Sequence, residues 1–151
     1  MYKVYQIKIS KEVKDFVNSN DRGHLGGEEK YPEYKAHMAV MRGAEGFTGD
    51  MFEHYTNVCN VAKDGGLVSG DEPFLVNDLE EVFKILNGYY FDEDANDEEG
   101  EDVVFDAHVS GYKMKTVTRK NGEEVTFRDM NSLSVGDIVQ DVDNDTYHIV
   151  D

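Results

Sequence analysis

Acidic side chains are concentrated in one stretch of this chain, and that stretch is poorly suited to supply a hydrophobic core. Between Asp64 and Tyr112 there are fifteen Asp or Glu residues and one base, Lys84, which gives −14 of the formal net charge of −17. The other 102 residues carry seventeen acids and fourteen bases. Eight acids fall within residues 92–102 alone. Because blocks of like charge repel each other and stay solvated, this run is typical of a solvated loop.

Length and composition fit a single small domain. A chain of 151 residues with 39% hydrophobic residues is long enough to bury a core. We expect neither a signal peptide at the N-terminus nor a membrane span, since no apolar run approaches the ~20 residues that a span needs. Cys59 is the single cysteine, so it can form neither an intrachain disulfide nor a zinc cluster. A reducing cytoplasm is therefore the expected location.

The N-terminal half predicts one strand followed by helices. Residues 2–9 alternate as a strand, and apolar side chains on both faces favour a position inside the sheet. Ser10 is placed to cap a helix over residues 11–19. We expect residues 20–27 to form a loop, because their glycines and the Asn-Asp pair favour turns. Pro32 suits the first position of another helix.

The C-terminal half predicts one amphipathic helix and two hairpins. Residues 78–86 have apolar side chains at helical spacing, with Asn77 and Glu80 as a capping-box pair. Asn121-Gly122 is a hairpin signal between the strand-like residues 112–119 and 123–128. The remaining expectations are a short helix from Thr48 or Asp50, a strand over 57–62, a loop over 64–71, and a second hairpin from 137–140 and 146–150. This order predicts an α+β single domain with a mostly antiparallel sheet and two or three helices.

Three short motifs carry a resemblance to a known family. They are Met1-Tyr2-Lys3-Val4-Tyr5-Gln6-Ile7, Asp78-Leu79-Glu80-Glu81-Val82-Phe83 followed by Asn87, and Ser132-Leu133-Ser134-Val135-Gly136-Asp137-Ile138-Val139. The chain resembles the small YodL-like proteins of phages and mobile genetic elements, and this resemblance covers about a third of it. The resemblance implies a core of residues 1–88 and 131–151, with residues 89–130 as an acidic insertion followed by a hairpin. The resemblance implies a mobile-element origin and a protein that acts on a host protein. It implies no catalytic residues.

The acidic stretch predicts a surface that binds a basic protein. Its field repels nucleic-acid phosphates and anionic membranes and attracts basic surfaces, so we expect no direct nucleic-acid or membrane binding. Carboxylates held at a density close to the one charge per ~1.7 Å of duplex DNA could mimic a nucleic acid. Aromatic residues beside the acids could anchor the contact. The predicted contact residues are Tyr89, Tyr90, Phe91, Asp92, Glu93, Asp94, Asp97, Glu98, Glu99, Glu101 and Asp102. The predicted partner is a host nuclease, a defence factor or the transcription machinery; the alternative is an accessory domain whose acids only confer solubility.

The sequence gives weaker signals for other kinds of functional site. His24 in the Arg22–Gly27 loop, with Glu28 or Glu29 nearby, could form a small enzyme or ligand site of the general acid–base type. Asp141, Asp143 and Asp145 alternate like calcium ligands, but Thr146 stands where the calcium loop needs Gly. A calcium loop starting at Asp92 fails similarly, since Asp97 replaces the Gly and Val103 the Glu. Cys59 lies in an apolar run and is expected in the core. We therefore expect no metal and no cofactor.

Overall fold

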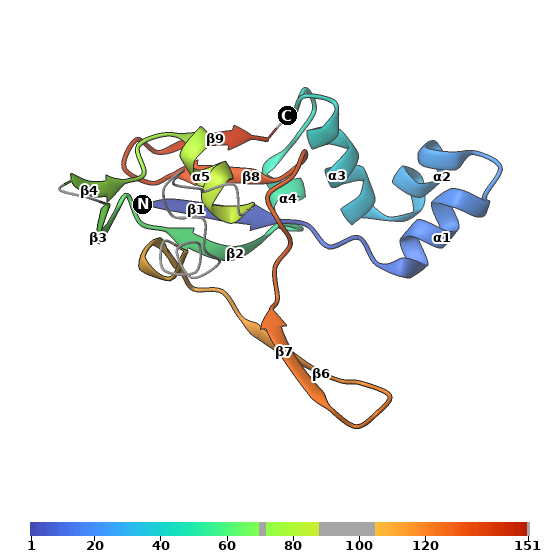
Figure 1. The fold of residues 1–151 in the computed structure, drawn as a ribbon. Coiled ribbons are helices and arrows are strands. Elements are labelled where there is room, and N and C mark those ends of the chain that lie inside the picture. Colours follow the sequence, from blue (N-terminus) through green and yellow to red (C-terminus); the bar gives the residue numbers. More distant parts are fainter. Residues whose placement is uncertain (70–71, 88–104, 151) are drawn as a thin grey trace.

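The chain folds around one antiparallel sheet with helices on both faces (Figure 1). The computed structural model describes residues 1–69, 72–87 and 105–150, without the side chains of 66–69 and 72–74. The main sheet has five strands in the order β5-β2-β1-β8-β9. The elements are β1 (Tyr2–Gln6), α1 (Lys11–Ser19), α2 (Gly23–Lys30), α3 (Pro32–Met41), α4 (Gly49–Phe52), β2 (Thr56–Val61), β3 (Asp64–Ser69), β4 (Glu72–Leu75), α5 (Leu79–Leu86), β5 (Val109–Ser110), β6 (Met114–Thr118), β7 (Glu124–Arg128), β8 (Ile138–Asp141) and β9 (Thr146–Ile149). The predicted α+β class and mostly antiparallel sheet are confirmed, although there are more helices than the two or three expected.

Strand β1 is the middle strand of the sheet, as its two apolar faces predicted. It pairs antiparallel with β2 on one side and with β8 on the other, and Val4 lies opposite both Cys59 and Val139. Tyr2, Val4 and Gln6 are buried. The strand ends at Gln6, three residues earlier than predicted.

Each face of the sheet is covered by helices. Helix α5 packs Val82 and Ile85 into the cluster that contains Tyr2 and Val4. A separate cluster holds Val40 of α3 with residues of β8 and of the chain just before β2. Helices α1 and α3 share a third cluster of Val13, Val17 and Tyr34. None of the helices within the described ranges is long and apolar enough to cross a membrane.

The predicted loop over residues 20–27 is wrong, because most of it belongs to helix α2. Two of its glycines, Gly26 and Gly27, serve close packing and not a turn. A Cβ on Gly27 would lie 2.5 Å from Val17 Cγ2 and 3.0 Å from the Tyr34 ring. Only glycine therefore lets α2 approach α1 and α3 this closely.

The predicted loop over residues 64–71 is also wrong in part, because it contains β3, which pairs with β4 in a separate two-stranded sheet. The glycines suggested a loop at a place where the chain forms a strand. The backbone N–H of Gly65 donates to His108 Nε2 at 3.2 Å, and a Cβ here would lie 2.7 Å from the His108 ring. A glycine inside a strand often marks such a close approach.

The cap of α5 differs from the prediction by one residue. Asp78 is the N-cap, and its side chain accepts a hydrogen bond from the Glu81 N–H at 2.9 Å. Asn77 therefore does not cap the helix. The helix ends at Leu86 with Asn87 as C-cap, as predicted.

Strands β6 and β7 form the predicted hairpin, with the turn at Asn121 and Gly122. They do not join the main sheet; they form a two-stranded sheet that projects from the rest of the protein (Figure 1). All five residues of β6 and four of the five residues of β7 are exposed. The second predicted hairpin is confirmed as β8 and β9, which are the last two strands of the main sheet.

Candidate functional site

Several described carboxylates gather at one end of the main sheet. Strand β1 begins there, and Tyr2 lies opposite Val61 of β2 and Asp141 of β8. The chain that follows each of those two strands brings further acids to this end. The carboxylates are Asp64, which follows β2, then Asp141, Asp143 and Asp145 of β8 and its turn, and Asp78, which acts on Tyr2 from the chain before α5. We call this set the acidic end.

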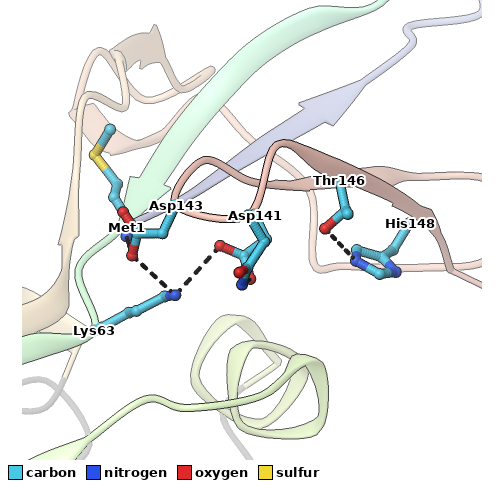
Figure 2. Close-up of polar contacts among 7 residues, drawn as sticks. Met1, Lys63, Asp141, Asp143, Thr146 and His148 are labelled. Atoms are coloured by element: carbon cyan, nitrogen blue, oxygen red, sulfur yellow. Dashed lines mark hydrogen bonds and ion pairs between the residues drawn. The ribbon is translucent and has the colours of Figure 1, made fainter.

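Lys63 links the carboxylates of the β8–β9 turn (Figure 2). Its Nζ lies 3.2 Å from Asp141 Oδ1 and 2.9 Å from Asp143 Oδ2. Asn144 Nδ2 donates to the other oxygen of Asp141 at 2.7 Å, and the terminal amine of Met1 lies 3.3 Å from Asp143 Oδ2. The Asp-rich segment is therefore a turn closed by ion pairs.

These contacts keep both carboxylates ionised. The hydrogen bond from Asn144 and then the contact with Lys63 lower the pKa of Asp141. Hydrogen bonds from Lys63 and the terminal amine lower the pKa of Asp143. Within the described ranges, Lys63 and the terminal ammonium pair with Asp141 and Asp143, and acidic residues outnumber these two cations at the acidic end.

The turn carries no evident metal chemistry. Two of the three alternating aspartates already bind an ammonium group, and Asp145 has a positive φ of 50° that fits a tight turn. Across the ranges that the structure describes, no cluster of three or more His, Cys, Asp or Glu side chains is placed to hold a metal ion.

The predicted contact residues Tyr89, Tyr90, Phe91, Asp92, Glu93, Asp94, Asp97, Glu98, Glu99, Glu101 and Asp102 all lie outside the described residues. The chain on both sides of them is tied to the body. Asn87 Nδ2 donates to the backbone oxygen of Leu133 at 2.9 Å. Phe105 packs against the main core cluster, with its ring centroid 5.7 Å from that of Tyr112.

The alternative site at Arg22–Gly27 does not have the predicted geometry. His24 is exposed, and its Nδ1 is hydrogen-bonded to the hydroxyl of Tyr34. Arg22 instead pairs with Glu29 at 2.5 Å on the exposed surface. Arg22 and Glu29 therefore pair with each other, as the prediction allowed, while His24 is engaged by Tyr34 instead.

Glu28 turns toward helix α3. Its two oxygens accept hydrogen bonds from the Arg42 guanidinium at 2.6 and 2.9 Å, which lower the pKa of the carboxyl. A hollow of about 340 Å³ nearby is lined by Glu28, Lys35, Arg42 and Met51 among others, while His24 lies outside its lining. A carboxylate neutralised by a bidentate arginine is a poor general base, so these residues carry no catalytic proposal.

Sequence reasoning missed a buried polar network under the Ser134–Asp137 turn. Asp137 Oδ2 accepts hydrogen bonds from the Ser134 N–H at 2.8 Å and from Gln6 Nε2 at 3.1 Å. Gln6 also bonds the backbone N–H and oxygen of Asn131. Burial raises the pKa of Asp137, against the lowering effect of these two hydrogen bonds. The only sequence signal was a polar Gln6 on the same face as Tyr2 and Val4.

Two of the three sequence motifs quoted above meet in this network. Gln6 belongs to the first motif, and Ser134, Gly136 and Asp137 belong to the last. Gly136 has a φ of 94°, and its oxygen accepts a hydrogen bond from the Tyr55 hydroxyl at 3.1 Å. The two motifs join the first strand to the turn before β8.

No protein family, curated protein or solved structure matches this chain.

Proposed function

We propose that this chain is a phage- or mobile-element-encoded acidic binding protein. It binds a host protein on a basic, nucleic-acid-binding surface and thereby inhibits or modulates that protein. The observation that carries the proposal is the charge distribution, since residues 64–112 hold −14 of the net −17. The resemblance to YodL-like proteins supports the mobile-element origin.

The acidic end carries charge of the sign that a basic partner would attract. Asp141 and Asp143 have lowered pKa values and stay charged at neutral pH. Burial raises the pKa of the Tyr2 hydroxyl at this end, and nearby carboxylates including Asp78 raise it further against the opposing charge of Lys63. Negative potential at the acidic end adds to the charge of residues 92–102 and strengthens long-range attraction of a basic partner.

The mechanism is competition for a cleft that normally holds DNA or RNA. A cleft lined with Lys and Arg binds a nucleic acid with release of counterions, which makes the affinity fall steeply with salt. Carboxylates that occupy the same cleft release the counterions of the basic partner. Binding by this protein is therefore expected to weaken with salt and to displace nucleic acid from the partner.

The test uses two variants with equal charge change. The first carries Asp92→Asn, Asp94→Asn, Asp97→Asn and Glu98→Gln. The matched control carries Asp15→Asn, Asp21→Asn, Asp50→Asn and Glu53→Gln, all at exposed positions of the helical part. Host proteins retained by the wild type at low salt and released at high salt are identified, and their affinities for both variants are measured.

The first variant should bind the retained protein at least about tenfold more weakly, with a flatter dependence on salt, and the control should bind nearly as well as the wild type. The wild type should also displace a short fluorescent duplex from the retained protein. Equal affinity for both variants and the wild type would contradict the proposal and leave the acids a role in solubility.

A further inference from the structure

The projecting hairpin exposes a continuous apolar face. We call residues 113–129 the arm. Val117, Val125 and Phe127 lie on one face of it and are 40%, 37% and 45% exposed. Val117 is directly opposite Val125, and Phe127 is the next residue on this face. Adjacent large apolar side chains on an exposed strand pair mark an interaction surface more often than single scattered ones do.

The arm is held at its base. The Arg128 guanidinium lies 3.8 Å from the centroid of the Phe105 ring, and Asp129 Oδ1 lies 2.9 Å from Lys8 Nζ. The backbone N–H of Asp129 donates to the oxygen of Lys113 at 2.7 Å. An isolated two-stranded hairpin has little stability of its own, so a partner that covers the apolar face would stabilise it.

A second apolar surface lies at the opposite edge of the main sheet. A groove of about 200 Å³ runs between α5 and β9, lined by Leu79, Leu133, Ile149 and Val150, with Glu80 among its residues. We call it the α5–β9 groove. Strand β9 is the edge strand here, and its outer side pairs with no other strand that the structure describes. An open strand edge beside an apolar groove can accept a strand of a hairpin.

The arm and the groove are complementary in charge. The arm, residues 113–129, contains five bases and three acids, or +2, which leaves −19 for the rest of the chain. Lys115 and Arg119 share the apolar face of the arm with its valines. Glu80, in the acidic first turn of α5, lines the groove, and its Oε1 lies 3.6 Å from the exposed Lys84 Nζ. A basic, apolar arm thus matches an acidic, apolar groove.

The arm cannot reach the groove of its own chain. It follows β5, which is the edge strand opposite β9. Four strand spacings of ~4.8 Å separate the two edges, and the arm points away from β9 (Figure 1). A second copy of the chain has the same α5–β9 groove, and the arm can reach that groove without this geometric restriction.

We propose that two copies form a two-fold dimer in which the arm of each docks in the α5–β9 groove of the other. Val117, Val125 and Phe127 enter the groove, and Lys115 and Arg119 face the acids of α5. Reciprocal docking closes the assembly and doubles the contact, which matters because stable interfaces bury roughly 1,600 Å². This inference goes beyond the proposed function and does not depend on it.

The first test is sedimentation over a wide concentration range at physiological ionic strength. The wild type should dimerise reversibly. Phe127→Asp should weaken dimerisation by about a hundredfold, as expected for an aromatic anchor. Thr116→Asp places the same charge on the opposite face of the arm and should change it by less than about threefold. A wild type that stays monomeric at all concentrations would overturn the proposal, and so would an equal loss in the two variants.

The second test separates arm exchange from direct pairing of two arms. Leu79→Asp alters the groove, and an acid at the first position of α5 suits the helix N-terminus, so the fold is retained. Each variant alone should be monomeric, whereas a mixture of Phe127→Asp and Leu79→Asp should form a heterodimer through one intact arm and one intact groove. No recovery on mixing would contradict arm exchange. Neither test involves a host partner, so failure here leaves the proposed function standing.

Discussion

The main sheet and the arm are both antiparallel and both contain alternating apolar residues, yet only the sheet is covered. Val139 in β8 is 1% exposed, whereas Val125 in β7 is 37% exposed. Helices on both faces make the difference, since α5 and α3 cover the sheet and no described element packs along the arm. Alternation shows which residues share a face, while burial decides whether that face stabilises the fold or is free for a contact.

Thiol labelling should give the largest contrast between the two regions. Cys59 is fully buried in the sheet, and burial raises the pKa of its thiol to about 12. At pH values near neutrality, labelling of Cys59 by a thiol reagent should be at least about a thousandfold slower than in the denatured chain, because it requires opening of the sheet.

A cysteine introduced in the arm by Thr116→Cys is the matched comparison. It should label at nearly the rate of the denatured chain, since Thr116 is exposed. Fast labelling of Cys59 in the folded protein would show that the sheet is less stable than its burial indicates.

Truncation of the two valines should separate the regions in stability. Val139→Ala should lower the free energy of unfolding by about 2 kcal/mol, through lost burial and a residual cavity. Val125→Ala should lower it by less than about 0.5 kcal/mol. Urea denaturation of both variants, at a protein concentration low enough to keep the chain monomeric, measures the difference. Similar losses would contradict the distinction between sheet and arm.

Substitutions of Asp137 test how much the buried polar network contributes to stability. Asp137→Ala removes the side-chain acceptor of the Ser134 N–H and one of the acceptors of the Gln6 amide, and it should cost roughly 1–3 kcal/mol. Asp137→Asn keeps an oxygen for both donors and should cost less. Urea denaturation at mildly acidic pH gives the comparison.

The pH dependence of Asp137 has a defined sign. Because burial raises its pKa in the folded state, the folded protein holds this proton more tightly than the unfolded chain does. The contribution of Asp137 to stability is therefore greatest in acid and is lost as pH rises through the folded pKa. The stability of Asp137→Asn relative to the wild type should rise with pH over that window; parallel curves would contradict this assignment.

The smallest effect is expected at the base of the arm. Arg128→Lys keeps the charge but loses the planar contact with the Phe105 and Tyr112 rings. The melting temperature should change little, while the arm should sample a wider range of orientations. Distances between spin labels on the arm and on α1 should broaden in the variant; an unchanged distribution would assign the orientation of the arm to the Lys8–Asp129 pair.

Local signals in the sequence predicted several elements correctly. The Asn121-Gly122 turn specified the β6–β7 hairpin, because turn chemistry acts between neighbouring residues. Ser10 caps α1 as expected, with its side chain accepting from the Val13 N–H at 3.3 Å. The two apolar faces of β1 predicted its central place in the sheet.

Features that depend on tertiary contacts could not be predicted from the sequence. Gly27 and Gly65 read as loop residues, yet each stands where another side chain or backbone approaches too closely for a Cβ. Asp137 could not be told from the many solvated acids, because its burial depends on Gln6, which lies 131 residues away in the chain. The exposure of the arm was equally hidden, since its pattern fits a covered strand as well.

The position of β1 also sets the order in which the protein can fold. Its partners on the two sides come from the middle and from the end of the chain, and the Tyr5 hydroxyl donates to Gln140 across 135 residues. Contacts of such high sequence separation slow folding, because loop closure precedes the gain from pairing. On the ribosome, β1 waits for β8 to emerge, so the central sheet is completed long after β1 itself is made, whereas the arm closes as soon as its own turn is made.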